Sequence, residues 1–329
     1  MNGRELVTRA VRFEGPERVP RDLPEAWGTD FLHVGVGADP NWKATVEGED
    51  EWGCVWQKVS IGDRSMGQVK VHPLEDYDML ADFPFPDYDL PERYNRIPEQ
   101  LAQGTQDRFV LTGIPFSLIH RLEYLRGHAN ALMDPYLNPE QVTALLEKLA
   151  ETALTSLKHL KGLGVNGIIS CDDWGLQDRP MMSPDTFRRF FKPFYKEVYH
   201  KAHEYGMLTF LHSCGHITEL LEDFIEAELD VIQMDQQQNM GVRELAARFG
   251  GRICFWCPVD IQSTMVNGSL QDIEDYCKEL IEQFGSYNGG FISKWYPSPD
   301  AAGHTQERIA AMAEAFVKYG DYTRKPVTS

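Results

Sequence analysis

Residues 207–241 read "MLTFLHSCGHITELLEDFIEAELDVIQMDQQQNMG", in which two apolar runs flank a segment with helical spacing. The runs at 207–215 and 230–241 are typical of strands that are buried on both faces. The segment between them, 216–229, places apolar residues on one face of a helix. A strand, a helix and a second strand in direct succession predict two parallel strands joined by a crossover helix.

The same alternation extends in both directions along the chain. Further strands are predicted at 108–117, 165–175, 252–260 and 289–297, and further helices at 138–164, 183–206, 242–251, 269–286 and 305–322. Pro193 lies inside the segment 183–206 and predicts a kink or a break there. Six strands, each followed by a helix, favour a parallel sheet that is covered on both faces. With further elements from the first third of the chain, we predict an α/β fold, a single (β/α)8 TIM barrel domain over residues 1–329.

One segment departs from this pattern. Residues 40–75 are polar, contain several glycines and alternate as β-strands do. We predict that they form an N-terminal hairpin excursion that caps one end of the barrel.

Composition excludes several classes of partner. The formal net charge is −18, whereas nucleic acids and anionic membrane surfaces are bound by clustered Lys and Arg. We therefore expect neither nucleic acid nor membrane as a partner. No run approaches the roughly 18 apolar residues of a membrane helix, and the start "MNGRELVTRAVRFEG" lacks the apolar core of a signal peptide. We expect a cytoplasmic protein, in which six cysteines serve as core residues, metal ligands or nucleophiles.

Polar and aromatic side chains gather where successive predicted strands end, which is where the active site of such a barrel lies. These residues are Asp172, Asp173, Trp174, His212, Cys214, Gln233, Asp235, Cys257, Lys294 and Tyr296. Core packing alone does not explain polar residues at the ends of several different strands. Asp172 and Asp173 either cap the turn that follows them or act in acid–base chemistry. We take Asp173 and Asp235 as catalytic candidates, and Trp174, Gln233, Lys294 and Tyr296 as substrate-binding candidates.

The spacing within "HSC" points to a metal. Side chains two apart on a strand face the same side, so His212 and Cys214 are expected side by side. Zinc binds both residue types, and catalytic zinc sites have three protein ligands and one open position. Cys254 and Cys257 are three apart and cannot both face inward from one strand. Cys257 is nearer the strand end and is the favoured third ligand, with Cys254 as the alternative; a buried Cys that only fills space is the competing interpretation.

Several motifs resemble those of the uroporphyrinogen decarboxylase superfamily. They include "RFEGPERVP", "DEWGCVW", "DDWGLQDRPMMSPDTFRRFFKPFYK" and "LHSCGHITELLEDFIEAELDVIQMD". The arginine-bearing signature of the decarboxylases is absent from "LPEAWGTDFLHVG", and the chain is more similar to the corrinoid-dependent methyltransferase branch. That resemblance implies a TIM barrel and zinc held by His212, Cys214 and a later Cys. No Cys follows Cys277, so the third ligand is Cys257 or an acid such as Asp235, or the metal is lost.

The resemblance implies a zinc-dependent methyltransferase that moves a methyl group between a small methoxy compound or thiol and a corrinoid protein. The chain has no cobalamin motif, so cobalamin is expected on a separate partner that docks over the barrel mouth. Trp174, Trp256, Trp295 and Tyr296 would give that mouth an aromatic wall, or belong to the core. The alternative is a metal-free lyase that acts on a carboxylated substrate, with Asp173 as its polar anchor and Lys294 and His212 as cationic groups. A barrel that only binds a ligand is the third interpretation.

Overall fold

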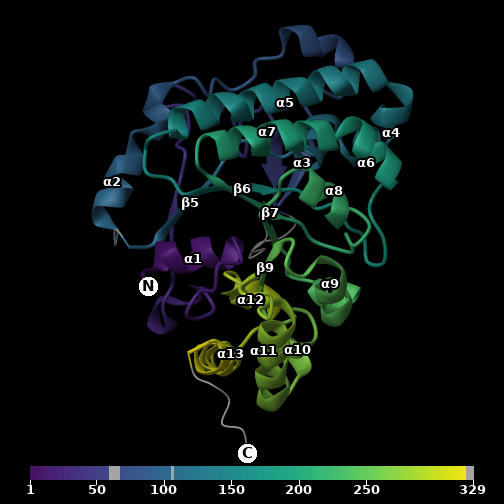
Figure 1. Ribbon diagram of the computed structural model, residues 1–329. Helices are drawn as coiled ribbons and strands as arrows, with labels where there is room; N and C mark the ends of the chain where they lie inside the picture. The colour runs from purple at the N-terminus through teal and green to yellow at the C-terminus, as the bar shows by residue number, and fades with distance from the viewer. Residues whose placement is uncertain (59–66, 105–106, 324–329) are drawn as a thin grey trace, which may run out of the picture.

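Eight parallel strands form a nearly closed barrel surrounded by helices (Figure 1). The computed structural model describes residues 1–58, 67–104 and 107–323. The strands follow the order β1-β10-β9-β8-β7-β6-β5-β2. Their bounds are β1 Arg21–Asp22, β2 Phe31–Val34, β5 Phe109–Gly113, β6 Gly167–Cys171, β7 Leu208–His212, β8 Val231–Gln233, β9 Cys254–Cys257 and β10 Phe291–Lys294. The prediction of a (β/α)8 TIM barrel is confirmed.

A salt-bridged turn joins the two ends of the sheet. Asp30, just before β2, donates its N–H to the Arg21 carbonyl of β1 at 2.7 Å and accepts the Arg21 N–H on Oδ2 at 2.7 Å. Arg18 holds the same carboxylate with two bonds of 2.7 Å. Since β1 and β2 share no ladder, this turn links the first and last members of the strand order.

The helices cover the outside of the barrel, and their bounds follow the predicted alternation. They are α1 Gly3–Val11, α2 Arg96–Gln103, α3 Ile119–Arg126, α4 His128–Leu137, α5 Pro139–Leu160, α6 Pro184–Phe190, α7 Lys192–Glu204, α8 Leu221–Glu226, α9 Val242–Phe249, α10 Thr264–Asn267, α11 Leu270–Phe284, α12 Pro299–Ala302 and α13 Gln306–Tyr319. The break predicted at Pro193 is confirmed: α6 ends at Phe190, and α7 starts at Lys192 with Pro193 in its first turn. None of the described helices is long and apolar enough to cross a membrane.

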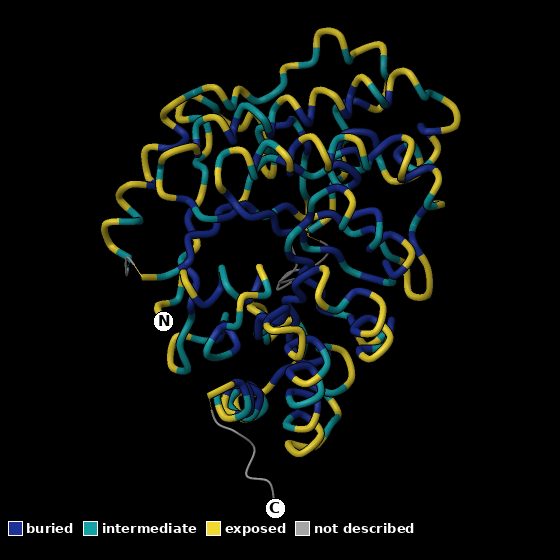
Figure 2. The backbone as a smooth tube through the Cα atoms, in the orientation of Figure 1, coloured by how far each residue is buried: buried dark blue, intermediate teal, exposed yellow. Residues whose placement is uncertain are grey.

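Two apolar layers fill the structure. The larger one lies between the strands and the surrounding helices. The smaller one fills the barrel interior, where Val7 and Val11 of α1 close the amino-terminal end against residues such as Phe109, Phe210 and Trp256. In Figure 2 the ring of strands is dark blue, which marks it as buried, and the outer turns are mostly exposed.

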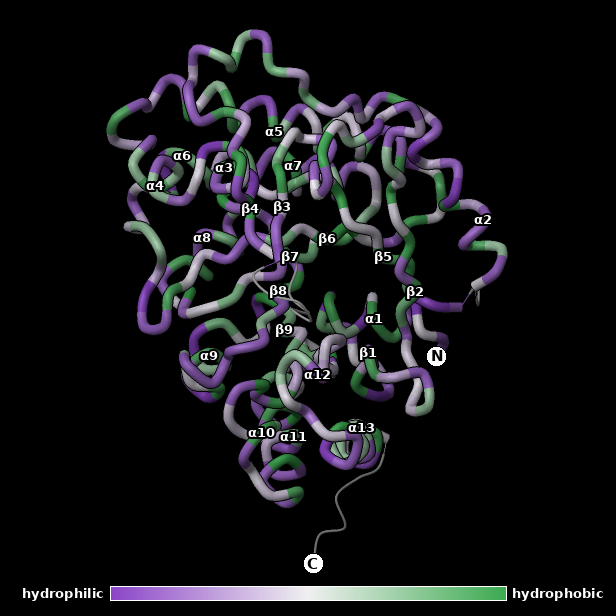
Figure 3. Tube along the Cα trace, turned by 180° about the vertical axis from the view of Figure 1, so that it is seen from behind, coloured by the Kyte–Doolittle hydropathy of each residue, from purple (hydrophilic) through white to green (hydrophobic). Residues whose placement is uncertain are grey.

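The segment predicted as a hairpin contains an antiparallel pair, β3 (Val55–Gln57) and β4 (Gln68–Val71). Residues 59–66 of its connection lie outside the described residues. The pair packs on α3, where the Trp56 and Tyr124 rings are 4.8 Å apart and His72 Nδ1 lies 2.9 Å from the Tyr124 carbonyl. The start of α3 is bonded to Asp172, which directly follows β6, so the pair packs on a helix that begins at the carboxyl ends of the strands; Figure 3 shows β3 and β4 from behind.

The strands are shorter than the sequence predicts at their carboxyl ends. The strands predicted to reach residues 175 and 215 end at Cys171 and His212. The polar residues beyond these points bond to loops: Asp172 accepts N–H groups of Leu118 and His120, and Asp173 accepts the N–H of Cys214. Loops at the barrel mouth therefore begin where the apolar alternation stops.

Gly167 makes room for aromatic side chains inside the barrel. A Cβ atom there would lie 2.9 Å from Phe109 Cε1 and 3.0 Å from Phe210 Cε2. We expect Gly167→Ala to lower the free energy of unfolding by about 1–3 kcal/mol because the packed interior has no space for it. Urea denaturation measures this effect. Gly113→Ala, on the adjacent strand with nothing within 4 Å of its Cβ, is the control and should change stability by less than about 0.5 kcal/mol; equal effects would contradict the packing argument.

Candidate metal centre

Inward-facing side chains from adjacent strands meet at the carboxyl end of the barrel. Phe210 faces the interior, and the alternation along β7 then points His212 the same way. Cys171 of β6 and Gln233 of β8 are the register neighbours of His212. Three adjacent strands therefore present polar groups at one level of the barrel, above the aromatic layer.

His212, Cys214 and Asp235 form one group with metal-ligand chemistry. One ligand atom from each lies within 4.8 Å of the others, and Cys214 Sγ is 3.3 Å from His212 Nε2. Cys214 lies two residues past the end of the strand, before a turn at Gly215 with φ of +78°. The expected pairing of His212 with Cys214 is thus present in the structure, although only His212 belongs to the strand.

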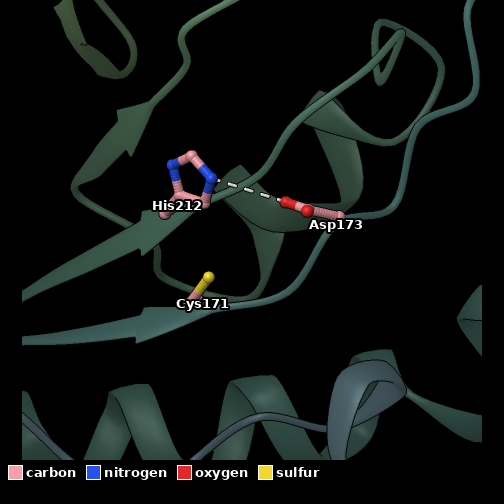
Figure 4. Close-up of side chains that lie close together, drawn as sticks. All are labelled: Cys171, Asp173 and His212. Carbon is pink, nitrogen blue, oxygen red and sulfur yellow. Dashed lines mark ion pairs between the residues drawn. The ribbon is translucent and has the colours of Figure 1, made fainter. Parts of the chain in front are cut away.

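Cys171, Asp173 and His212 form a second group of the same kind (Figure 4). Asp173 Oδ1 lies 3.5 Å from His212 Nε2. His212 belongs to both groups, and its ring lies between two carboxylates and two thiols. Imidazole, thiol and carboxylate groups converge here, and these are the ligand types that a borderline-soft cation such as zinc takes.

Gln233 orients the ring of His212. Its Oε1 bonds His212 Nδ1, and its Nε2 donates to Asp235 Oδ1 at 2.7 Å. An amide oxygen only accepts, so His212 carries its proton on Nδ1 and turns the lone pair of Nε2 toward the site. Gln233, predicted to bind substrate, is buried and instead supports two prospective ligands.

Lys294 neutralises part of the negative charge beneath the site. Its Nζ lies 3.7 Å from Asp235 Oδ1 and donates to the Trp295 carbonyl at 3.0 Å. Both Lys294 and Asp235 are buried. Tyr296, half-buried, borders the same region, where burial and the charges of Asp235 and Cys214 raise the pKa of its phenol.

Asp173 is an ionised anchor. Burial favours a higher pKa for its carboxyl, but the hydrogen bonds with His120 and with the Cys214 N–H, and the electrostatic interactions with the neighbouring imidazoles, outweigh it and lower the pKa to about 2. Its Oδ1 accepts the Cys214 N–H at 2.8 Å, and its Oδ2 lies 3.4 Å from His120 Nε2. At neutral pH this carboxylate accepts hydrogen bonds and does not supply a proton.

Asp172 points the other way and caps the start of α3. It is fully buried and accepts the N–H groups of Leu118 at 2.6 Å and His120 at 3.0 Å, together with the hydroxyls of Ser117 and Tyr195. Burial raises the pKa of this carboxyl. Of the two roles considered for the Asp172–Asp173 pair, the structure gives Asp172 the capping contacts and turns Asp173 toward His212.

Two of the predicted site residues lie away from the group. Trp174 is fully buried beneath α6 and α7, where its Nε1 donates to the Tyr195 hydroxyl at 2.9 Å, so it does not line the mouth. Cys257 belongs to the apolar layer between strands and helices, and neither ligand group includes it. The reason is register: Trp256 pairs with Gln233 and faces inward, which turns Cys257 outward. Cys254 faces inward but lies in the deeper aromatic layer.

Burial also raises the thiol pKa of Cys214, and the charges of Asp173 and Asp235 raise it further. Without a cation, Cys214 is therefore a neutral thiol next to the Nε2 lone pair. A bound divalent cation would reverse this by favouring the thiolate. The donor set of His212, Cys214 and Asp235 fits zinc in ligand type and number.

The sequence analysis did not identify two residues that belong to the site, His120 and Cys171. His120 has no ligand spacing of its own and reaches Asp173 from the first turn of α3. Cys171 lies two residues before Asp173, so the alternation that paired His212 with Cys214 also predicts that Cys171 and Asp173 share a side. That signal was present in the sequence.

The sequence and fold of this chain match a known protein family. The family model described as uroporphyrinogen decarboxylase (URO-D) matches residues 57–295. The chain belongs to the uroporphyrinogen decarboxylase family, an enzyme superfamily, which confirms the resemblance seen in the sequence motifs. Among curated proteins, none matches the chain at a significant level.

Two solved structures illustrate the structural similarity. A methyltransferase from Methanosarcina mazei aligns with a TM-score of 0.72 at 17% identity, over 97% of this chain and 99% of that one. This similarity shows the shared fold. Xylanase 10B from Thermotoga maritima aligns with a TM-score of 0.42 at 12% identity, over 72% of this chain and 83% of that one, which is too distant to support an inference.

The loops that carry Asp173 and Cys214 cross at two glycines. A Cβ atom on Gly215 would overlap the carbonyl group of Gly175, and the converse substitution would overlap Gly215. We expect Gly215→Ala to lower the free energy of unfolding and to weaken zinc binding, because backbone cannot move aside as a side chain can. Chemical denaturation and zinc titration measure the two effects.

Gly206→Ala is the matched control, since Gly206 has φ of +77° but nothing within 4 Å of its Cβ. It should cost only the left-handed backbone strain of about 1–2 kcal/mol and leave zinc affinity unchanged. The crossing argument fails if both variants lose the same stability and bind zinc as the wild type does.

Proposed function

We propose that this protein is a zinc-dependent methyltransferase that moves a methyl group between a small methoxy compound or thiol and cobalamin carried by a separate corrinoid protein. The observation that carries the proposal is the convergence of His212, Cys214 and Asp235 within 4.8 Å at the barrel mouth. The similarity in fold to a methyltransferase supports the reaction class.

In this proposal Asp235 takes the place of the later Cys that the resemblance implies. Its Oδ1 is fixed by Gln233 and lies near Lys294, so the carboxylate is already oriented before any cation binds. One histidine, one cysteine and one carboxylate would leave the fourth position of a tetrahedral site open to substrate. When bound, zinc would polarise a methoxy oxygen or lower the pKa of a thiol acceptor.

In this proposal, other residues of the chain keep the zinc ligands in position and bind the substrate. Gln233 keeps the proton on His212 Nδ1 and so keeps Nε2 available. Asp173 holds the Cys214 loop through the Cys214 N–H, which makes it a positioning residue in this scheme. Lys294 and Tyr296 would contact the substrate from the end of β10, and the Lys294 Nζ lies 6.0 Å from the centroid of the buried Trp256 ring.

The protein partner belongs to the proposal because cobalamin is expected on a separate protein. Leu176, in the loop that follows β6, is an exposed apolar side chain whose carbonyl accepts the N–H of His216 in the neighbouring loop. A corrinoid protein that contacts this loop would bring its cobalamin over the barrel mouth.

Zinc content per chain tests the proposal. We expect about one zinc in the wild type under reducing conditions, a loss of zinc in His212→Ala and Cys214→Ser, and a clear weakening in Asp235→Asn. Cys257→Ala is the control because its side chain lies outside both ligand groups, and it should keep the wild-type zinc content. Plasma emission spectrometry on desalted protein measures the zinc content per chain.

Two outcomes would contradict the proposal. Zinc lost in Cys257→Ala but kept in Asp235→Asn would overturn Asp235 as the third ligand. A wild-type protein that binds no zinc and converts a carboxylated substrate without cofactor would point to the metal-free lyase.

A further inference from the structure

The second ligand group, Cys171, Asp173 and His212, contains a thiol, that of Cys171, which has no role in the reaction proposed above. Its three ligand atoms lie within 4.8 Å of one another, as those of the first group do. Cys171 and His212 are register partners at the ends of adjacent strands, and Figure 4 shows Cys171 Sγ and the Asp173 carboxylate on the same side as the ring. The strands of the barrel therefore position two of the three ligand residues, Cys171 and His212.

The two groups compete for one lone pair. His212 Nδ1 is engaged by Gln233 Oε1, which leaves Nε2 as the nitrogen that can bind a cation. Nε2 lies 3.3 Å from Cys214 Sγ, which belongs to the first group, and 3.5 Å from Asp173 Oδ1, which belongs to the second. A single imidazole lone pair serves one cation at a time, so the groups are alternative positions for the same ion.

The exposure of the ligand residues shows which of the two positions lies nearer the solvent. In one group Cys171 is exposed and Asp173 is half-buried; in the other Cys214 is half-buried and Asp235 is buried. His212, which they share, is half-buried. An ion that arrives from solvent meets the Cys171 group before it reaches Asp235.

From this arrangement we infer that Cys171, Asp173 and His212 form an outer loading position for a soft divalent cation, from which the ion passes to the inner position at His212, Cys214 and Asp235. The inference rests on the proposed zinc function. The bond to His212 Nε2 is retained during the transfer, while Cys171 Sγ and an Asp173 oxygen are exchanged for Cys214 Sγ and an Asp235 oxygen. Cys171 takes up the proton that the Cys214 thiol releases, so charge and protons balance.

His120 keeps the outer carboxylate in place throughout. Its Nε2 lies 3.4 Å from Asp173 Oδ2, and its ring stacks on Tyr124 at 5.7 Å. The Asp173 carboxylate is therefore held in one orientation whether or not an ion is present. The carboxylate is a fixed part of the loading position, and Cys171 is the most exposed of its three ligand residues.

Cobalt(II) reports the two positions directly, because a cobalt–thiolate bond gives a charge-transfer absorption band that serine cannot produce. The experiment titrates cobalt(II) into the full-length wild type, Cys171→Ser, Cys214→Ser and the double variant under anaerobic, reducing conditions. Cys277→Ser serves as a control for cysteine replacement, since its thiol is buried at α11 and bonds the Met312 carbonyl. Circular dichroism confirms that each variant is folded.

We expect Cys214→Ser to keep a thiolate–cobalt band with affinity weaker by roughly tenfold or more, because the ion remains at the outer position. The double variant should lose the band completely. Cys171→Ser should keep the band at equilibrium but acquire it several times more slowly than the wild type in stopped-flow mixing.

The result that overturns the inference is distinct from the one that overturns the proposed function. A wild-type band that disappears in Cys214→Ser alone means that no outer position exists, while the inner site stands. Equal uptake rates for the wild type and Cys171→Ser overturn the loading role. Absence of any cobalt or zinc binding by the wild type removes the proposed function and the inference together.

Discussion

The hydrogen bond between Gln233 Oε1 and His212 Nδ1 joins two neighbouring strands and determines what the barrel mouth can bind. It fixes the histidine tautomer, and through its Nε2 the same amide fixes Asp235. An imidazole that presents an unprotonated Nε2 beside a thiol and two carboxylates is a cation site by its chemistry. With the opposite tautomer, Nε2–H would face Asp173 as a hydrogen-bond donor, and neither ligand group would be complete.

The loops after β6 and β7 hold this arrangement through backbone contacts. Gly175 N–H donates to the Cys214 carbonyl at 3.1 Å, and Trp174 N–H donates to Ser213 Oγ at 3.1 Å. Asp172 ties the first of these loops to α3, while Asp173 ties it to the second loop. The two adjacent aspartates thus have different roles. Asp172 anchors the loop to α3, and Asp173 faces the prospective metal ligands.

The sequence predicted the barrel and the side of the sheet on which His212 and Cys214 lie. These features follow from local alternation and from the length of apolar runs. It did not predict that Cys257 faces outward, because the facing of a strand depends on its register with a neighbour, here Gln233 with Trp256. Nor did it predict that Trp174 is buried, since that depends on the packing of α6 and α7 over the loop. His120 reaches the site from the first turn of α3, a relation that only the tertiary fold reveals.

The central claim is that zinc is held by one imidazole, one thiolate and one carboxylate. X-ray absorption spectroscopy at the zinc edge of the loaded wild-type protein tests it most directly. The account predicts one sulfur at about 2.3 Å and the remaining nitrogen and oxygen neighbours at about 2.0–2.2 Å. Two sulfurs in the zinc shell would contradict the account by requiring a second cysteine, and a shell without sulfur would remove Cys214 from the site.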